Sequence, residues 1–551
     1  MVNTVFSKLL LCTLIGAVCS LSPRQDSSVV DLGYAQYQGV YDSSINVTNY
    51  RGVRYAAPPT GDLRWRAPQT PEHVSGIQQA STEPPSCFQA PNGGALFSSS
   101  VAVESEDCLF LNVAFPGAGI PPKGLPVIVW IHGGGYVIGN ASQYHASDLV
   151  QDSRGSVVAV VIQYRLGLFG FLAGDEMKEN GVLNAGLLDQ RFALRWVQEN
   201  VGPDLFIVGD CRLIAFWYHK ISKFGGDPTQ VTIWGQSAGG GSVMQHIIAE
   251  DGQTNPKLFK AGISSSTYMA GQYEYNDDVP KNLYNEVVSQ TNCSSSSDSL
   301  ACLRAADTTS LASANVNINL AGFSGTFSIV PVLDGTYITQ SPTAALKQGK
   351  LNGEALLVVG NTNEGFIFVN QTAPANLTQY VRDLFPKFGS GEVDAVVQQY
   401  KGLGTELDQV NAVMNEGAAD RHSRGTNPKI SSALFLCPMY LITEAFKDRA
   451  WKGHFAIPPS LHGDDLNYYF PTSPLFGFPT NFNNSDFQKA FSESFLSFVV
   501  HQDPNVKLDP TSILPQWNKF SDGQNEMVFN RTNDAPDLHS ATADQALLER
   551  C

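Results

Sequence analysis

The chain has 551 residues, of which 43% are hydrophobic and 16% charged, and its formal net charge is −16 with a pI of about 5.0. Such an acidic balance excludes a nucleic-acid-binding protein, which needs a basic surface, and opposes adhesion to anionic membranes. The length and the hydrophobic fraction suffice for a large globular core.

The first twenty residues have the pattern of a secretory signal peptide. Lys8 precedes an apolar run over residues 9–18, and the small residues Cys19 and Ser20 follow. This segment is short and ends in a cleavage-like site, which distinguishes it from a membrane span. No later stretch is apolar enough over a sufficient length to cross a bilayer. We therefore predict a signal peptide at 1–20 and a secreted single domain at 21–551, since no linker or repeat divides the rest.

Residues 125–131 form an apolar run of strand length, and a glycine-rich segment, His132 to Gly135, follows it. An ester carbonyl that is attacked becomes an oxyanion, which needs preorganised N–H donors. A glycine run after a strand lets backbone amides approach closely, and the residue after a nucleophile supplies one more. We predict an oxyanion hole made by the amides of Gly134, Gly135 and Ala238. The alternative is a loop that only turns the chain.

Residues 235–239 read Gly-Gln-Ser-Ala-Gly and follow the apolar run 231–234. A serine on a sharp strand-to-helix turn has its hydroxyl exposed to substrate, and the flanking glycines avoid clashes at the turn. Residues 240–250 are suited to the helix that follows. The pattern predicts Ser237 as a nucleophile.

An acid and then a base should follow the serine along the chain. Residues 355–360 read as a strand, and Glu364 in the loop at its end is the predicted acid. Residues 451–455 read as another strand, with His454 inside it and His462 on the loop that follows. A catalytic imidazole belongs on such a loop, so His462 is the predicted base. His454 is the alternative.

Several long motifs identify the chain as similar to the type-B carboxylesterase/lipase family, which includes fungal lipases and cholinesterases. Residues 224–239 fit that family's active-site signature, and residues 106–113 resemble its second signature. Residues 50–56 and 184–191 are also family-like, and the likeness runs from about residue 30 to near the end. The resemblance implies an α/β-hydrolase fold, in which a mostly parallel twisted sheet has helices on both faces and large excursions cover the active site.

The predicted mechanism uses Ser237, His462 and Glu364. His462 takes the serine proton as the hydroxyl attacks an ester, and Glu364 holds the imidazole in the right tautomer. The resulting acyl-enzyme is hydrolysed by water through the same route. The partner is a small-molecule ester. We expect no metal, no organic cofactor and no stable membrane insertion, and the sequence leaves the oligomeric state open.

Two positions depart from the family pattern. The residue before the nucleophile is often glutamate in the family, and here it is Gln236, which removes a negative charge beside the site. The segment 263–267 reads Ile-Ser-Ser-Ser-Thr where Ser-Gly is usual, and Ser266 is the candidate for the serine that supports the triad.

Residues 201–220 interrupt the family pattern. Joining residue 200 directly to residue 221 gives WVQENISKFGGDP, which continues that pattern. Valine codons begin with GT and lysine can be AAG, so we favour an intron retained in the gene sequence. The alternative is a genuine surface insertion, at the end of the serine-bearing strand opposite the active site. Its apolar residues would then form an exposed loop that is unusually prone to associate with other apolar surfaces.

The cysteines suit an oxidising compartment. Of nine, Cys12 and Cys19 leave with the signal peptide and Cys211 lies in the suspected insert. By resemblance, Cys87 pairs with Cys108 and Cys293 with Cys302. This leaves Cys437 and Cys551 to pair with each other or to remain free thiols.

Seven glycosylation sequons support passage through a eukaryotic secretory pathway. They begin at Asn46, Asn140, Asn292, Asn370, Asn376, Asn483 and Asn530. Asn292 precedes a bridged cysteine and Asn140 lies near the oxyanion loop, so these two are the least suited to carry a glycan.

The segment between Cys87 and Cys108, which is the lid of the family, is short and has few large apolar residues. We therefore expect an esterase for short-to-medium acyl esters rather than a triacylglycerol lipase, unless loops at 268–284 or 366–388 supply the missing apolar surface. That segment also lacks a tryptophan for binding quaternary ammonium groups, which opposes a cholinesterase. A function of another class is a non-catalytic binding or adhesion ectodomain, which the complete set of predicted catalytic residues opposes.

Overall fold

The structure is a computed structural model that describes residues 28–96, 103–122, 124–208, 212–417, 434–473 and 480–551. The predicted signal peptide and Cys211 lie outside these ranges. Within them, no helix has the length and apolar character needed to span a membrane.

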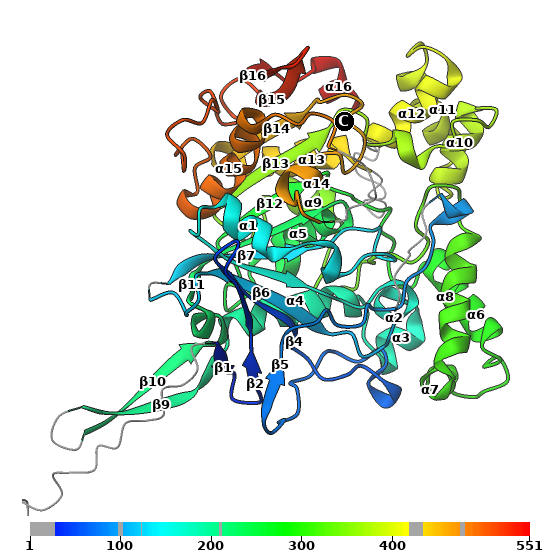
Figure 1. The fold of residues 1–551 in the computed structure, drawn as a ribbon. Helices are drawn as coiled ribbons and strands as arrows, with labels where there is room; N and C mark the ends of the chain where they lie inside the picture. Colours follow the sequence, from blue (N-terminus) through cyan, green and yellow to red (C-terminus); the bar gives the residue numbers. More distant parts are fainter. Residues whose placement is uncertain (1–27, 97–102, 123, 209–211, 418–433, 474–479) are drawn as a thin grey trace, which may run out of the picture.

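One large mixed sheet organises the described chain (Figure 1). Its eleven strands in spatial order are β16 (Ala535–Thr542), β15 (Asn525–Thr532), β14 (Ala450–Phe455), β13 (Ala355–Asn361), β12 (Ala261–Ser265), β11 (Gly226–Gln236), β7 (Leu125–Ile131), β8 (Val158–Ile162), β6 (Phe110–Pro116), β4 (Val47–Arg54) and β3 (Val40–Asp42). The strands from β15 to β8 in this order run parallel to one another. The pairs β16–β15, β8–β6, β6–β4 and β4–β3 are antiparallel. A small separate sheet contains β1 (Val29–Asp31), β2 (Gln36–Gln38) and β5 (Ile77–Gln79).

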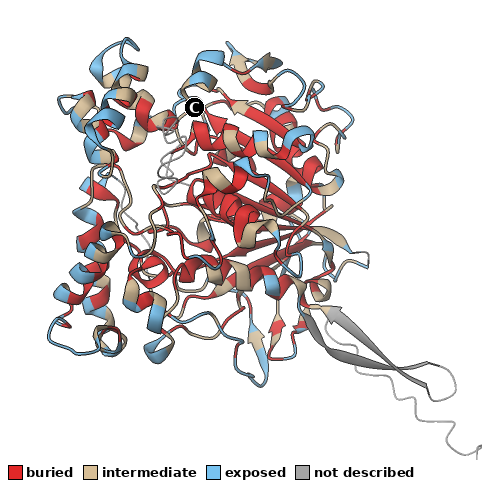
Figure 2. Ribbon diagram, turned by 180° about the vertical axis from the view of Figure 1, so that it is seen from behind, coloured by how far each residue is buried: buried red, intermediate tan, exposed pale blue. Residues whose placement is uncertain are grey.

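The central strands are apolar on both faces because helices cover both faces, which is the usual situation of a parallel sheet. All five residues of β8 are buried. Along β7, Val129 and Ile131 belong to one apolar cluster, whereas Ile128 and Trp130 belong to a second. Figure 2 shows these buried residues concentrated in the sheet and in the helices against it. The continuous apolar runs in the sequence thus predicted the buried strands correctly.

The described helices pack on the two faces or lie in excursions. The α-helices are α1 (Ala146–Asp152), α2 (Gly167–Phe171), α3 (Asp175–Asn180), α4 (Ala185–Gln198), α5 (Ala238–Ile248), α6 (Asp278–Gln290), α7 (Ser299–Ala305), α8 (Thr308–Leu320), α9 (Pro342–Lys347), α10 (Leu377–Leu384), α11 (Ser390–Tyr400), α12 (Glu406–Glu416), α13 (Leu436–Phe446), α14 (Leu466–Tyr469), α15 (Ser485–His501) and α16 (Gln545–Arg550). The 3-10 helices are η1 (Gly61–Leu63), η2 (Gly93–Ala95), η3 (Ala141–Gln143), η4 (Lys220–Phe224), η5 (Ala249–Gly252), η6 (Phe366–Phe368) and η7 (Lys447–Arg449).

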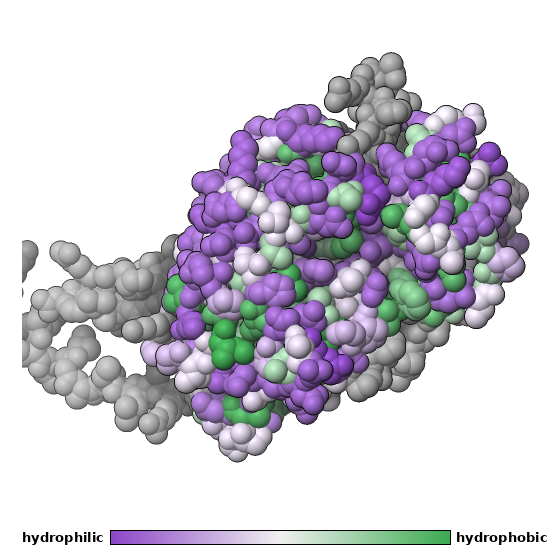
Figure 3. Space-filling view, turned by 90° about the horizontal axis from the view of Figure 1, so that it is seen from above, coloured by the Kyte–Doolittle hydropathy of each residue, from purple (hydrophilic) through white to green (hydrophobic). Residues whose placement is uncertain are grey.

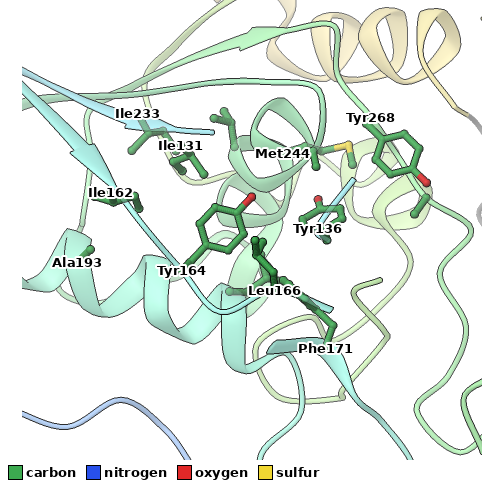
Figure 4. Close-up of a cluster of buried hydrophobic side chains, with 14 of the residues drawn as sticks. Ile131, Tyr136, Ile162, Tyr164, Leu166, Phe171, Ala193, Ile233, Met244 and Tyr268 are labelled. Atoms are coloured by element: carbon green, nitrogen blue, oxygen red, sulfur yellow. The ribbon is translucent and has the colours of Figure 1, made fainter. Parts of the chain in front are cut away.

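Helices α4, α5 and α13 contribute to the first apolar cluster, and α1, α14 and α15 contribute to the second. Figure 4 shows part of the first cluster, where Ile131 and Ile233 of the sheet lie with Ala193 of α4 and Met244 of α5. The sheet is therefore the middle layer of three, which fixes the position of its strand ends.

Two excursions leave the sheet at the carboxyl ends of adjacent strands. The chain between β12 and β13 contains α6 to α9, and the chain between β13 and β14 contains α10 to α13. In Figure 1, α6, α8 and α10 to α12 stand on one side of the sheet. Because parallel strands end at the same edge, both excursions start at the edge where β11 reaches Ser237.

Residues 200–208 and 212–219 form the two strands of a hairpin that projects from the body at the lower left of Figure 1. Its strands, β9 (Asn200–Val208) and β10 (Arg212–His219), pair only with each other. The residues that flank the hairpin lie side by side, because the amide of Lys220 donates to the carbonyl of Glu199 at 2.8 Å. It precedes β11, at the end of that strand away from Ser237. Whether residues 201–220 come from a retained intron stays a prediction.

All six cysteines in the described ranges form disulfides. The pairs are Cys87–Cys108, Cys293–Cys302 and Cys437–Cys551, with Cα–Cα distances of 5.0, 5.7 and 5.0 Å. These distances lie in the usual disulfide range. Cys437 and Cys551 are therefore not free thiols.

The sequon asparagines differ in their exposure. Asn46, Asn292, Asn370, Asn376 and Asn483 are exposed, and Asn530 is half-buried. The exposure of Asn292 removes the steric part of the objection to glycosylation there. Asn140 is 1% exposed and accepts a hydrogen bond from Ser142, so the folded chain offers no room for a glycan at that position.

Candidate active site

Ser237 stands on a sharp turn between β11 and α5. Its backbone has φ 58° and ψ −124°, a conformation that costs a residue with a side chain about 1–3 kcal/mol. The two flanking glycines permit the turn. A Cβ on Gly235 would lie 2.4 Å from the carbonyl carbon of Gly239, and a Cβ on Gly239 would lie 2.0 Å from the carbonyl oxygen of Ile131. The turn has the strand-to-helix geometry that the motif predicts.

Glu364 and His462 are joined by a short hydrogen bond. His462 Nδ1 lies 2.5 Å from Glu364 Oε2, and the glutamate side chain is fully buried. The other oxygen of Glu364 accepts the backbone N–H of Asn361 at 2.6 Å. Because a carboxylate only accepts, Nδ1 carries the proton, and Nε2 of the neutral imidazole presents its lone pair.

The loops that carry the acid and the base are hydrogen-bonded to each other. The amide of Thr362 donates to Ser460 Oγ at 2.8 Å, and the amide of Asn363 donates to the carbonyl of Ser460 at 2.8 Å. Asn363 Nδ2 also donates to the carbonyl of Pro459 at 2.8 Å. These bonds hold the loop after β13 beside the loop after β14, so the Glu364–His462 pair is built into the fold.

His454, the alternative base, lies inside β14 as expected. Its Nε2 is 2.9 Å from Thr362 Oγ1, whereas Glu364 is bonded to His462. Burial lowers the pKa of His454. The structure places His462, and not His454, on the predicted acid.

The glycine-rich loop after β7 lies against the serine turn. A Cβ on Gly133 would stand 2.9 Å from Ser237 Cβ. Gly134 and Gly135 have φ values of 101° and 62°, which favour glycine. Ala238 is the first residue of α5, so its amide has no partner within the helix. The glycine-rich loop therefore contacts the serine turn at Gly133, and the oxyanion hole of Gly134, Gly135 and Ala238 stays a prediction.

Gln236 is a further polar neighbour of the base. It is 1% exposed, at the end of β11, and its Nε2 lies 3.3 Å from His462 Nε2. The sequence singled out this residue for its missing charge but did not predict the contact.

Asn361 connects the acid to two other polar side chains. Its Nδ2 donates to Ser266 Oγ and to Asp465 Oδ1, both at 3.1 Å, and lies 3.4 Å from Glu364 Oε1. Ser266, the candidate support serine, therefore reaches the triad through Asn361. The sequence singled out neither Asn361 nor Asp465. Their positions, three residues before Glu364 and three after His462, are the signal that could have found them.

Asp465 is fully buried beside this network. Burial raises the pKa of Asp465 to about 7, and the nearby Glu364 adds to the rise. Its Oδ2 has no hydrogen-bond partner among the described residues. A second acidic group thus stands next to the acid–base pair and titrates near neutral pH.

Aromatic rings surround the base and continue into a cavity. Phe368 and Phe435 pack on His462 with ring-centroid distances of 5.1 and 4.7 Å, and Tyr268 packs on Phe435 at 5.5 Å. Tyr268 and Phe327 line a mostly apolar cavity of about 270 Å³. The backbone amide of Tyr268 donates to the carbonyl of Ser237 at 3.1 Å, so this wall residue contacts the serine turn, while Ser237 and His462 are not among the residues that line the cavity.

Most of the cavity walls come from the excursions. Val279 and Leu283 of α6 line it, as do Asp383 and Phe385 at the end of α10. No described residue between Cys87 and Cys108 is in the lining. The loops left open by the sequence, at 268–284 and 366–388, therefore supply part of the walls, and the rest comes from residues 171–173, from residues between Phe323 and Val332, and from Leu434. Sequence reasoning did not identify the individual wall residues because they share no motif or spacing.

No group of three His, Cys, Asp or Glu side chains in the described part of the chain is arranged to hold a metal ion. The chemistry of the site is that of a hydroxyl, an imidazole, a carboxylate and backbone amides. Such a set can form and hydrolyse an acyl-enzyme.

Comparison with known proteins shows the family of the chain. The chain matches the carboxylesterase family over residues 26–203 and 214–547, and the gap falls inside the suspected insert. It is 31% identical over 521 residues to the secreted triacylglycerol lipase LIP1 of Gibberella zeae, covering 87% of this chain and 83% of that protein. It is 27% identical to Lipase 1 of Geotrichum candidum, over 88% of each chain. Lipase 4 of Diutina rugosa is 32% identical over 64% of this chain, and the matched stretch spans 65% of that lipase, which is less than two thirds of its length.

Solved structures agree as well. The crystal structure of Aspergillus niger EstA has a TM-score of 0.77 with 27% identity and covers 95% of this chain and 96% of its own. A PNB esterase, at 23% identity and a TM-score of 0.72 over 93% and 97% of the two chains, supports the fold alone. The chain therefore has the α/β-hydrolase fold and belongs to the carboxylesterase family of carboxylic ester hydrolases.

Proposed function

We propose that the protein is a secreted serine carboxylic-ester hydrolase that acts on short-to-medium acyl esters through a Ser237–His462–Glu364 triad. The observation that carries the proposal is the 2.5 Å bond between His462 and Glu364, on loops that meet at the strand ends beside the strained Ser237 turn.

In the proposed reaction, His462 Nε2 removes the proton of Ser237 while the serine oxygen attacks the ester carbon. The amides of Gly134, Gly135 and Ala238 donate to the oxyanion. The imidazolium returns its proton to the leaving alcohol, and Glu364 stabilises the positive charge meanwhile. Water then repeats the sequence on the acyl-enzyme.

The cavity supports the proposed substrate range. Its volume of about 270 Å³ lies below the range of about 300–1,000 Å³ that is typical of sites for drug-sized ligands. In Figure 3, hydrophilic residues predominate on the visible face, and apolar residues form small separate groups. A lipid-binding face would need a larger continuous apolar patch than any on this face.

A triacylglycerol lipase is the second candidate, because the relatives from Gibberella, Geotrichum and Diutina are named lipases. Secretion is supported by the three disulfides, by the exposed sequons and by the secreted Gibberella relative.

Hydrolysis of p-nitrophenyl esters from acetyl to palmitoyl tests the proposal, with S237A as the control. We expect activity that is highest at short-to-medium chains and absent in S237A. A maximum at long chains would favour the lipase. A folded protein that hydrolyses no ester would favour the non-catalytic binding ectodomain.

A further inference from the structure

The side chain of Gln236 contacts Nε2 of His462, the nitrogen of the general base that must accept the serine proton in catalysis. Nδ1 of His462 is bonded to the carboxylate of Glu364, so Nε2 of the neutral ring is an acceptor. The amide nitrogen of Gln236 lies 3.3 Å from Nε2, and the hydrogen bond between two nitrogens requires one donor. The Gln236 carboxamide is that donor, and it covers the lone pair that must accept the proton of Ser237.

The surroundings leave room for the carboxamide in this place. Gln236 is buried at the end of β11, and the chain continues directly into the Ser237 turn. The absence of a side chain at Gly133 provides the space, because a Cβ there would lie 3.0 Å from Gln236 Oε1 and 2.7 Å from the backbone oxygen of Gln236.

We propose that Gln236 is a positioning residue that caps Nε2 of His462 in the free enzyme and must release it for acylation. This inference rests on the proposed function of His462. When the imidazolium forms, Nε2 of His462 carries the proton that the leaving alcohol must receive, so the amide nitrogen of Gln236, which can only donate, has to move away from it. No proton leaves or enters Gln236 in this exchange.

The cap is neutral, and this determines how the base responds to pH. The titratable groups that face His462 are Glu364 on Nδ1 and the nearby Asp464 and Asp465, whose charges also act on the ring. Gln236 adds no charge on the Nε2 side. A carboxylate at this position would favour the imidazolium, which cannot act as a base.

Two substitutions separate the effect of the cap's neutral charge from the effect of its hydrogen bond to Nε2. Q236E keeps the shape and adds the charge, and we expect the acidic limb of the kcat/KM profile for p-nitrophenyl butyrate to move by about one pH unit or more to higher pH. Q236M keeps the volume and removes the donor. Inactivation by phenylmethylsulfonyl fluoride, a small reagent for the serine, should then become about fivefold faster, because one competing neutral hydrogen bond is lost.

The control is Q245M, which changes another buried glutamine, on α5, whose Oε1 has no hydrogen-bond partner among the described residues. It should leave both measurements at the wild-type values. A Q236E profile that superimposes on the wild type would overturn the proposal, and so would a folded Q236M that is inactivated no faster than the wild type. If Q236M does not fold, the Q236E profile decides alone.

The same experiment separates this inference from the proposed function. If the wild type neither hydrolyses the ester nor reacts with the reagent, the triad proposal fails. If the wild type is active, S237A is inactive and both Gln236 variants behave like the wild type, only the role of Gln236 is rejected.

Discussion

The ring of Phe327 packs directly on Gly135, where an added Cβ would lie 2.3 Å from three ring carbons. A residue of the predicted oxyanion loop thus touches a wall residue of the cavity. The place where the ester carbonyl would be polarised and the place where its acyl chain would lie are adjacent, and changes at either residue should affect catalysis in different ways.

We expect G135A to lower kcat about 100-fold or more, which is the usual effect of losing one oxyanion donor. The added methyl would meet Phe327, and φ of 62° is unfavourable for alanine. G349A is the matched control, because Gly349 has φ of 67° and nothing within 4 Å of its Cβ position. Kinetics with p-nitrophenyl butyrate check this. A wild-type kcat in G135A would show that Gly135 is not part of the oxyanion hole.

Removing the ring at residue 327 should lengthen the preferred acyl chain. In F327A, the space beside Gly135 would join the cavity, and longer chains would bury more apolar surface there, at about 25 cal/mol per Å². The ratio of kcat/KM for p-nitrophenyl decanoate to that for the butyrate measures the change and should rise. F366A, which removes an exposed phenylalanine, is the control. An unchanged ratio would show that the acyl chain does not pass Phe327.

Replacing the acid should lower activity without unfolding the protein. In E364Q the amide can donate to Nδ1, so His462 can adopt the tautomer whose Nε2 carries the proton and cannot accept one from Ser237. We expect kcat to fall by about 10³–10⁴-fold, as in other triads with this change. E354Q, an exposed change just before β13, should have wild-type kinetics. Activity of E364Q within tenfold of the wild type would argue against Glu364 as the acid.

Asp465 should make the folded protein less stable as the pH rises. Because burial raises its pKa from 3.8 to about 7, the folded state holds this proton more tightly than the unfolded state. The stabilisation is complete below pH 4 and is lost as the pH rises to 7, by up to about 4 kcal/mol at 1.36 kcal/mol per pKa unit. The melting temperature of D465N relative to that of the wild type should therefore rise from pH 4 to pH 7. The exposed change D522N should show no such rise, and a constant difference between D465N and the wild type would refute this role.

Deleting residues 201–220 should leave a folded, active enzyme. The hairpin starts and ends at neighbouring residues, Glu199 and Lys220, and lies at the end of β11 away from Ser237. We expect the kcat of the shortened chain for p-nitrophenyl butyrate to equal that of the full chain. Failure to fold would mark the hairpin as a genuine part of the protein. Transcripts that uniformly contain the segment would exclude the retained intron.

The sequence predicted those parts of the molecule whose residues are neighbours along the chain. The apolar runs that precede Gly133, Gly235 and Glu364 correspond to β7, β11 and β13. The run that contains His454 corresponds to β14. These strands end at one edge, so the motifs after them meet there. Residues such as Phe327 and Asn361 come close to the site only through the packing of excursions and loops, which no local period or motif encodes. The alternative to a retained intron at residues 201–220 was an exposed loop, and the described part of this segment instead contains the paired strands β9 and β10.

The hydrogen bonds between the loops at 362–363 and 459–460 have an evolutionary consequence. Because these bonds hold the Glu364–His462 pair together, substrate is not needed to assemble it, and the entropy of aligning the two side chains is lost during folding. The walls of the cavity come from separate stretches of chain, on α6, around Phe327 and after α10. Substitutions in those stretches can alter the accepted ester while the reacting groups keep their alignment, so new substrate preferences can arise without a loss of catalytic competence on the way.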